Sequence, residues 1–353
     1  LNSKERFKPD IWENRPEKAA VIGAGPAGLS CAYYMAIEGY KVTVFEKQPV
    51  LGGMLTLGIP SFRLERDVIN AEIDVIRELG VEFKTGIEVG KDITIPQLRE
   101  QGYKAFYIAI GAQNGRNLGM EGEDLPGFIT GVDFLREVNL GQVELEGSVV
   151  VIGGGNVAID VARAAVRCGA DPVEIYCLET MAEMPAQDEE ICEARDEGVV
   201  IHPSWGLNRI ISNEGRVTAV ELKKCVSVFD ENGSFNPKYD ESVTKIVDAS
   251  TVIASIGQAI NLGGLLEGSS ITTKSNQTIN VAEISFQTGD PDVFAGGDVV
   301  TGPKYAIDAI AAGKQGATSI HRYIQGRSLT MRRESEYRPL DRQNLDLQGY
   351  DRM

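Results

Sequence analysis

Two glycine-rich turns of the kind that bind dinucleotides stand in this chain, one near its start and one near its middle. Residues 21–28 read VIGAGPAG and residues 150–158 read VVIGGGNVA, each after a β-branched run and before an alanine-rich helical pattern. About 20 residues after each turn, the next predicted strand ends in a glutamate, Glu46 or Glu179. The two strand–turn–helix–strand–acid units predict an α/β protein with two Rossmann-like (βαβ) dinucleotide-binding domains. Two dinucleotides on one chain indicate that one is oxidised by the other.

Each glycine of the first turn has a physical task. Gly23 allows the tight turn, and Gly25 lets backbone N–H groups approach a pyrophosphate that a Cβ would exclude. Gly28 lets the helix lie close to the strand, and the positive N-terminus of that helix then faces the phosphates. We expect Glu46 to accept hydrogen bonds from the ribose hydroxyls of an adenosine.

A third glycine motif, late in the chain, completes the first unit. Residues 295–298 read AGGD, and an alanine-rich helix is expected from about Tyr305 to residue 320. An aspartate after two glycines at a strand end can bond the ribityl chain of a flavin. The N-terminus of the following helix can stabilise negative charge on the reduced flavin. This combination predicts that the first unit binds FAD.

The FAD domain would therefore be built from both ends of the chain, with the NAD domain inserted into it. The connecting segments, 111–115 and 257–264, are glycine-rich, so we expect the inserted domain to rotate as a unit. The expected division is 1–114 for the first part of the FAD-binding domain, 115–256 for the NAD(P)H-binding domain, 257–330 for the second part of the FAD-binding domain, and 331–353 for a C-terminal linker or tail.

Composition argues against several kinds of partner. A net charge of -16 over 353 residues disfavours nucleic acid, whose phosphates attract Lys and Arg. The sequence has no apolar run of membrane-spanning length and no secretory signal, so we expect a cytoplasmic protein without membrane insertion. The five cysteines form no CxxC pair and no spacing typical of zinc or iron–sulfur sites. We therefore expect no metal site and no redox dithiol within the chain.

With these motifs the chain resembles the two-dinucleotide-binding flavoproteins, and within them the small (beta) subunit of glutamate synthase and its relatives. The resemblance covers nearly the whole chain, from about residue 19 to residue 326. The matching stretches are GGMLTLGIPSFRL (52–64), IAIGA (108–112), GGNVAIDVAR (154–163), MPA (184–186) and AGGD (295–298).

The resemblance implies contact residues for both cofactors. For FAD it implies Gly23, Gly25, Pro26, Ala27, Gly28, Glu46, Lys47, Gly53, Met54, Ile59, Arg63, Ala109, Ile110, Gly111, Gly297, Asp298 and Ala306. For the pyridine nucleotide it implies Gly153, Gly155, Asn156, Val157, Glu179 and Gly257. No catalytic acid or base is expected, because hydride passes directly between stacked rings and catalysis is mainly positioning. Arg63 is the charged side chain to test for an effect on the flavin potential.

Members of this family typically move electrons from NAD(P)H through FAD to iron–sulfur clusters, some of them on a cysteine-rich N-terminal domain. That domain is not part of this sequence, so the resemblance implies clusters on another domain or subunit as the acceptor. It supports flavin reduction better than glutamate synthesis. Two alternatives stay open. One is a stand-alone flavodoxin or ferredoxin reductase, and the other is a non-catalytic FAD-holding scaffold module.

NADH is the expected donor, with NADPH less favoured. Glutamate synthase relatives that use NADPH carry a pair of arginines before the MPA segment, suited to the 2′-phosphate. Counting back from Met184, those positions are Leu178 and Glu179 here. A carboxylate accepts hydrogen bonds from a free 2′-hydroxyl and repels a 2′-phosphate. Arg163 and Arg167, on the preceding helix, are the nearest side chains that could reach over to a phosphate.

Overall fold

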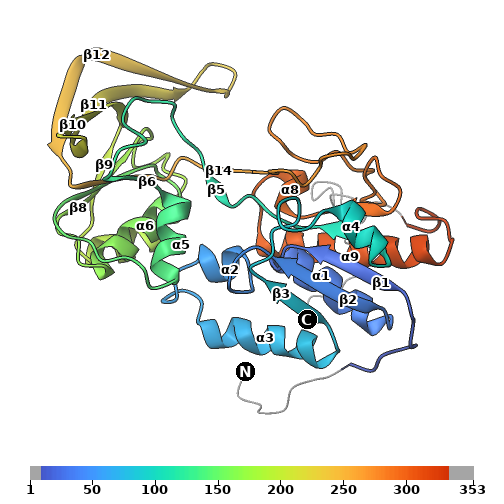
Figure 1. Ribbon diagram of the computed structural model, residues 1–353. Helices are drawn as coiled ribbons and strands as arrows, with labels where there is room; N and C mark the ends of the chain where they lie inside the picture. The colour runs from blue at the N-terminus through green and yellow to red at the C-terminus, as the bar shows by residue number, and fades with distance from the viewer. Residues whose placement is uncertain (1–8, 334–353) are drawn as a thin grey trace, which may run out of the picture.

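The computed structural model describes residues 9–333, which form two lobes joined side by side (Figure 1). We call residues 9–113 with 260–333 the outer domain, and residues 116–257 the inserted domain. The two strands that connect them, β5 (Asn114–Gly115) and β14 (Gln258–Ala259), pair antiparallel with each other. The chain therefore enters and leaves the inserted domain at one place. Most of the expected tail, from residue 334 onward, lies outside the described residues.

A five-stranded parallel sheet forms the centre of the outer domain. Its middle strands are apolar and buried on both faces, as is typical of a parallel sheet between two layers. The strand from the last part of the chain takes one edge, so both ends of the chain build this sheet. In spatial order the strands are β15 (Val293–Ala295), β4 (Tyr103–Ile108), β1 (Lys18–Ile22), β2 (Lys41–Glu46) and β3 (Glu82–Thr85).

Helices and loops cover the two faces of the outer sheet. One core joins α1, α3 and α9 to one face, and a second core joins α4 and the loops after residue 259 to the other. Helix α1 packs closely on α9. An ideal Cβ on Gly313 of α9 would come within 2.2 Å of the carbonyl oxygen of Ala27, so the helices can approach this closely because residue 313 is a glycine. The helices are α1 (Pro26–Ile37), α2 (Met54–Leu57), α3 (Arg66–Glu78), α4 (Ile95–Glu100), α8 (Asp298–Thr301) and α9 (Ala306–Ile324).

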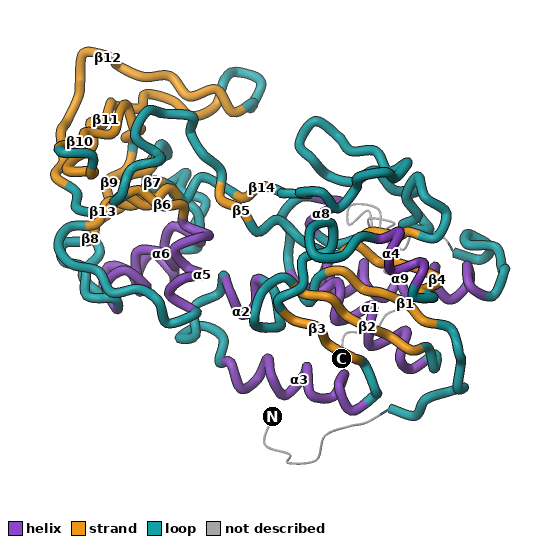
Figure 2. Tube along the Cα trace, viewed as in Figure 1, coloured by secondary structure: helices purple, strands orange, loops and turns teal. Residues whose placement is uncertain are grey.

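The inserted domain is a second parallel sheet between helices and a smaller antiparallel sheet (Figure 2). Helices α5 (Gly131–Asn139), α6 (Asn156–Arg167) and α7 (Asp188–Asp196) pack on one face. An antiparallel sheet covers the other face, formed by β10 (Trp205–Asn213), β11 (Arg216–Phe229) and β12 (Phe235–Asp248). In spatial order the parallel strands are β6 (Phe128–Thr130), β13 (Thr251–Ala254), β7 (Val149–Ile152), β8 (Val173–Cys177) and β9 (Val200–Pro203).

The two helices that follow the glycine turns begin without a side-chain cap. Gly25 and Gly155 are the N-cap residues of α1 and α6, and neither has a side chain that could bond the first N–H groups. Pro26 occupies the first position of α1, where its fixed φ and missing N–H are no disadvantage. The first turns of both helices therefore keep N–H donors for an anion.

Candidate functional site

Steric contact explains the glycines of the first turn. Gly23 has φ +104°, and an ideal Cβ there would lie 2.4 Å from the carbonyl oxygen of Ala109. A Cβ on Gly28 would lie 1.9 Å from the carbonyl oxygen of Gly23. Strand, turn and helix are thus in backbone contact, and only glycine allows this arrangement. The structure brings the turn against the end of β4, where Ala109 lies.

Glu46, the last residue of β2, is fixed beside this turn. Its Oε2 accepts a hydrogen bond from the Ala24 N–H at 2.8 Å, and its Oε1 accepts one from the Gln48 N–H at 2.8 Å. The residue is only 2% exposed, and burial raises its pKa while the backbone donors act in the opposite direction. The side chain is therefore held in one orientation by its own turn.

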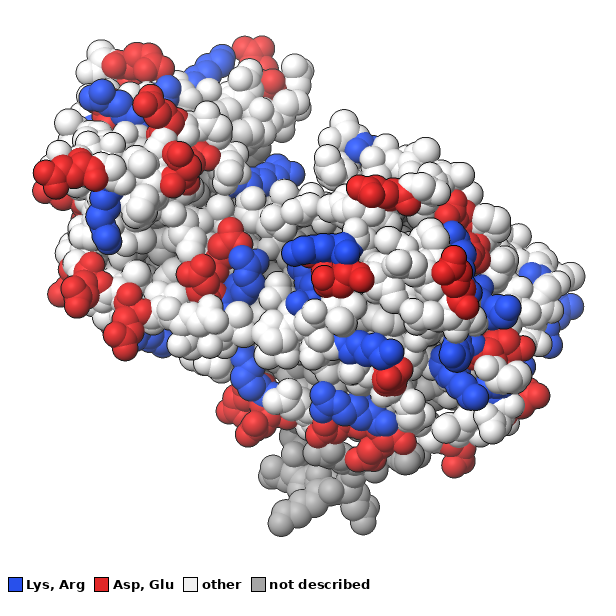
Figure 3. Space-filling view, viewed as in Figure 1, with Lys and Arg blue, Asp and Glu red and all other residues white. Residues whose placement is uncertain are grey.

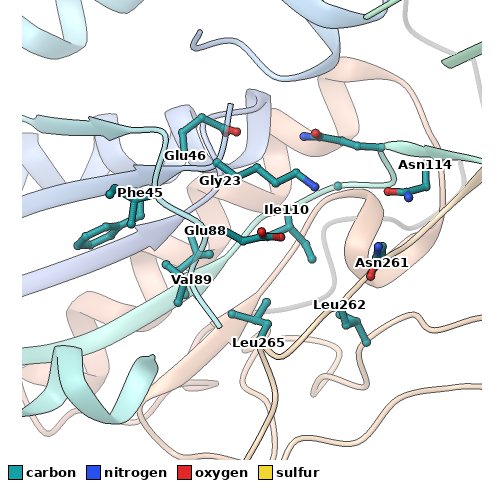
Figure 4. Close-up of a pocket in the computed structure, with 15 residues that line it drawn as sticks. Gly23, Phe45, Glu46, Glu88, Val89, Ile110, Asn114, Asn261, Leu262 and Leu265 are labelled. Atoms are coloured by element: carbon teal, nitrogen blue, oxygen red, sulfur yellow. The ribbon is translucent and has the colours of Figure 1, made fainter. Parts of the chain in front are cut away.

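A narrow pocket opens between Glu46 and the loop after β14 (Figure 4). Gly23 and Glu46 lie side by side at one end, and Asn261 and Leu265 lie across from them. Lys47, Ile110 and Gly111 also line it, so five of the expected FAD residues meet here. Its position past the ends of β1 and β2 suits the adenosine half of a dinucleotide.

A larger cavity of about 830 Å³ lies between the two domains. From the outer domain it is lined by the expected FAD residues Gly25, Pro26, Ala27, Gly53, Met54, Ile59, Ala109, Ile110, Gly111, Asp298 and Ala306. From the inserted domain it is lined by Val132, Leu135, Val157 and Asp160. Sequence reasoning missed Val132, Leu135 and Asp160. The sequence did carry a signal for Asp160, because it is a charged residue within the apolar helix pattern that follows the second turn.

The late glycine motif closes one side of this cavity. Gly297 has φ +76°, and an ideal Cβ there would come within 2.9 Å of the Cβ of Ala27 in α1. Asp298 follows, and burial raises the pKa of its carboxyl. Tyr305 is the N-cap of α9 and provides no side-chain cap. The N–H groups of the first turn of α9 thus lie at the cavity wall, beside Ala306.

The second glycine turn repeats the first and binds a further segment. Gly153 has φ +140°, and a Cβ there would lie 2.3 Å from the carbonyl oxygen of Ser255. Gly154 accepts a backbone hydrogen bond from Ala186 at 3.1 Å, and Asn156 Oδ1 accepts one from the Gln187 N–H at 2.9 Å. The MPA segment is thus fixed on top of this turn. Of the expected pyridine nucleotide residues, Val157 reaches the large cavity.

The prediction that Glu179 ends the strand after the second turn is wrong by two residues. Strand β8 ends at Cys177, and its register places Cys177 where Glu46 lies in the first unit. The Glu179 carboxylate nevertheless reaches the turn, since its Oε2 lies 2.7 Å from an ideal Cβ on Gly154. Among residues 9–333 we find no hydrogen bond to this carboxylate, in contrast to Glu46. The missing Cβ of Gly154 explains how the side chain can cross the turn from its later position.

Arg163 and Arg167 bind Glu193 of α7 and Glu197, the residue after α7, instead of reaching toward Glu179. Arg163 contacts Glu193 and lies 2.8 Å from Glu197, and Arg167 lies 2.8 Å from Glu197. These contacts lower the pKa of Glu197 to about 2, mainly through its hydrogen bond with Arg167. Both guanidinium groups also lie over the ring of Phe62.

Arg63 binds the inserted domain. Its Nη1 lies 2.8 and 2.9 Å from the two carboxylate oxygens of Asp160, and its Nη2 lies 2.6 Å from Glu190 Oε1. The flavin contact expected for Arg63 stays a prediction. Gly257, with φ +114°, lies at the connection between the domains beside Arg116 rather than in either pocket.

Comparison with known proteins agrees with this geometry. A family model described as pyridine nucleotide-disulphide oxidoreductase matches residues 17–313. The fold and the paired turns therefore define a flavin-dependent oxidoreductase that uses a pyridine nucleotide. The chain belongs to this pyridine nucleotide-disulphide oxidoreductase family and is of the glutamate synthase small-subunit type, so the resemblance expected from the motifs is confirmed.

Two relatives and one solved structure illustrate the match. The chain is 41% identical over 314 residues to the NADP(+)-dependent formate dehydrogenase subunit beta of Moorella thermoacetica, covering 88% of this chain and 44% of that protein. It is 35% identical over 340 residues to the glutamate synthase (NADPH) small chain of Halomonas elongata, covering 90% and 71%. It superposes on FprA from Mycobacterium tuberculosis in complex with NADPH, with a TM-score of 0.74 and 20% identity over 88% and 85% of the two chains. That likeness confirms the predicted α/β fold class.

The surface adds two observations. Within residues 9–333, no helix is long and apolar enough to cross a membrane. On the face shown in Figure 3, acidic and basic side chains are interspersed rather than gathered by sign.

Proposed function

We propose that this chain takes hydride from NADH onto FAD and passes the electrons to iron–sulfur clusters on another domain or subunit. One observation carries the proposal: residues from both glycine turns line a single cavity, Pro26 from the first and Val157 from the second. A flavin held at the first turn and a nicotinamide held at the second would meet there. FAD, when bound, supplies the group that accepts a hydride and releases single electrons.

The residues around the cavity fit both cofactors. An ideal Cβ on Gly111 or Gly155 meets no atom within 4 Å, so the backbone there faces open space that a ligand can fill. Asp298 provides an acceptor for a polyol hydroxyl, and the first turn of α9 brings a positive helix end to the same wall. The chain's part in catalysis is then to hold two rings together and to stabilise negative charge, without a general base.

We propose NADH as the donor because of the two residues that follow β8, Leu178 and Glu179. Leu178 packs against Gly206 of β10, and the Glu179 carboxylate lies over the second turn with no basic partner among residues 9–333. Arg163 and Arg167, the side chains that could have bound a 2′-phosphate, are held by Glu193 and Glu197. Both relatives named above carry NADP(H) in their names. The proposal therefore gives this chain a different donor from the one in the names of those relatives. It attributes the difference to Leu178 and Glu179.

Steady-state reduction of a dye acceptor with each donor tests this assignment. We expect kcat/KM to favour NADH by about tenfold or more, equivalent to about 1.4 kcal/mol. Glu179→Arg should shift the ratio toward NADPH, while Glu183→Arg, which places the same charge four residues away, should shift it much less. Equal or higher efficiency with NADPH in the unmodified protein would contradict the assignment.

The acceptor is proposed to be an iron–sulfur protein or domain that approaches the open side of the cavity. Tyr305 lines the cavity at the start of α9, and it and the neighbouring Ile307 are 80% and 68% exposed. The chain spans less than half of the Moorella relative, which is named as a subunit. Anaerobically reduced protein should transfer electrons to a [4Fe–4S] ferredoxin and not to a disulfide. Flavin that neither NADH nor NADPH bleaches would support the scaffold alternative instead.

The cysteines support a reducing compartment, and we propose the cytoplasm. All five are free in the structure, and burial raises the pKa of the thiols of Cys31 and Cys177, so these two are held as inert thiols.

A further inference from the structure

The loop after α2 reaches from the outer domain into the inserted domain. There Nη1 of Arg63 donates to both carboxylate oxygens of Asp160 in α6, and Nη2 contacts Glu190 of α7. The two carboxylates are 9% and 13% exposed, against 31% for the arginine. The neighbouring Phe62 ring lies under Arg167 and Arg163, at 4.0 and 4.7 Å from their guanidinium carbons. The adjacent side chains of Phe62 and Arg63 therefore hold the loop against the inserted domain.

The site that receives Arg63 is built on the second glycine turn. Asp160 lies one helical turn after Asn156 along α6. Asn156 Oδ1 bonds the N–H of Gln187, and Gln187 is the N-cap of α7, so this bond fixes where α7 begins. Glu190 stands in the first turn of α7. Both carboxylates that bind Arg63 are therefore positioned by the backbone expected to bind the pyridine nucleotide.

The other end of the loop is built into the wall of the large cavity. Met54 and Ile59 line the cavity and precede Arg63 by a few residues. Arg66 donates to the carbonyl oxygens of Leu55 and Ile59 at 2.7 and 2.8 Å. Asn139 of the inserted domain donates to the carbonyl oxygen of Leu57 at 2.9 Å. The loop is therefore a short and well-supported connection between the cavity wall and the second turn.

Electrostatics make the contact strong but breakable. Removing Arg63 would leave Asp160 without a bonded cation and Glu190 with only the longer contact to Arg163, at 3.6 Å, so two poorly hydrated like charges would be left close together. The interface at this loop consists of ion pairs and hydrogen bonds, with the Phe62 ring stacked on charged groups. A polar contact of this kind suits domains that separate and close again better than a continuous apolar interface does.

We propose that Arg63 is a positioning residue that couples occupation of the second glycine turn to the seating of the inserted domain over the flavin cavity. The inference rests on the proposed function, because it assigns to Arg63 the alignment of nicotinamide with flavin. A nucleotide on the second turn would lie against Asn156, whose bond to Gln187 fixes the start of α7, and so against the elements that carry the two carboxylates holding Arg63. The arginine then fixes the angle at which the two rings stack.

Three variants test this proposal in the full chain. Arg63→Ala removes the contact, and Arg63→Lys keeps the charge but replaces the planar, forked guanidinium with a single ammonium group. Arg99→Ala is the matched control, because Arg99 binds two carboxylates, Asp290 and Asp292, entirely within the outer domain. Three quantities are measured anaerobically: the rate of flavin reduction, the dissociation constant for NADH, and the long-wavelength charge-transfer absorbance of the stacked rings.

For Arg63→Ala we expect flavin reduction to slow about 10- to 100-fold, since a misplacement of about 1 Å can have that effect. The charge-transfer band should be lost, while the dissociation constant for NADH changes by less than about threefold, or about 0.7 kcal/mol. Arg63→Lys should recover part of the rate and of the band. Arg99→Ala should leave all three quantities within about twofold, or about 0.4 kcal/mol, of the unmodified protein.

An Arg63→Ala protein with the original rate and band would overturn the proposal, as would a loss shared equally by Arg99→Ala. If neither NADH nor NADPH reduces even the unmodified chain, the proposed function fails. Small-angle scattering then still decides on the contact itself. A more extended particle for Arg63→Ala than for Arg99→Ala supports the positioning role, and identical particles contradict it.

Discussion

The two glycine-turn units have the same fold but are closed differently. In the first, Glu46 bonds the Ala24 and Gln48 N–H groups and is buried. In the second, the acid comes two residues later, and we find no hydrogen bond to its carboxylate among residues 9–333. Both carboxylate oxygens of Glu46 thus accept hydrogen bonds from the backbone of their own turn. The Glu179 carboxylate, in contrast, can accept hydrogen bonds from a ligand. This difference suits a cofactor that stays bound at one turn and a substrate that exchanges at the other.

The helices that follow the two turns, α1 and α6, also pack differently. Helix α1 is in backbone contact on two sides, because a Cβ on Gly28 would meet the Gly23 carbonyl oxygen and a Cβ on Gly313 would meet the Ala27 carbonyl oxygen. At the position equivalent to Gly28, the second unit has Ala158, which is fully buried in an ordinary apolar core. Helix α6 is held by that apolar core and by ion pairs of Arg163 and Arg167 with Glu193 of α7 and with Glu197 after it. The first unit is rigid through backbone contact, and the second is held by side chains.

The largest effect is expected from adding a methyl group at the tight helix. Gly28→Ala places a Cβ 1.9 Å from a carbonyl oxygen. It should therefore cost about 3 kcal/mol of stability and release FAD. The reverse change in the second unit, Ala158→Gly, should cost only about 1 kcal/mol, the usual helix penalty. Flavin content per chain and the free energy of unfolding measure both. Similar losses for the two variants would show that the units are not packed differently.

The acids provide the next test. Glu46→Gln keeps the size of the side chain but turns an NH₂ group toward one of two backbone donors. We expect FAD affinity to fall by about 2 kcal/mol, or about 30-fold, when apoprotein is titrated with FAD. Glu179→Gln should leave FAD affinity unchanged and alter the preference between NADH and NADPH. A Glu179→Gln protein that loses FAD would contradict the assignment of the two turns.

Asn156 gives a smaller and separable effect. Asn156→Ala removes the acceptor for the Gln187 N–H and should cost about 1 kcal/mol of stability and weaken NADH binding. Asn156→Asp retains the acceptor, so we expect it to restore stability. Its charge opposes the pyrophosphate, so NADH affinity should stay low. Unfolding curves and NADH titrations distinguish the two roles, and an Asp variant with normal NADH affinity would argue against phosphate binding at this turn.

The smallest effect depends on pH. The pKa of Glu197 is lowered to about 2, so its pairing with Arg167 and Arg163 stabilises the fold above its unfolded pKa of about 4.3 and is lost as pH falls toward 2. After allowance for solvent screening, Glu197→Gln should cost about 1 kcal/mol at pH 7. Urea unfolding of both proteins should give midpoints that differ at pH 7 and converge near pH 2. A constant difference would mean that the glutamate acts through packing.

Local patterns were enough to predict the two turns, the late AGGD segment and the insertion of one domain into the other. Gly23 and Gly28 are required by contacts within one βαβ unit, so their residue types carry the signal. The prediction that the strand ends at Glu179 was wrong because the end of β8 is set by its pairing with β7 and β9. Residue spacing alone does not reveal that pairing. The partners of Arg63 depend on how two domains sit together, and no periodicity in either segment encodes that placement.

The pairing of β5 with β14 has a consequence for how such chains can be recombined. Both ends of the inserted domain emerge at neighbouring residues, so a gene segment for residues 116–257 could be exchanged as one cassette without rerouting the surrounding backbone. Donor choice would travel with that cassette, whereas flavin chemistry would stay with the host. The contacts between the domains, among them those of Arg63, Phe62 and Leu57, would have to match across the new junction.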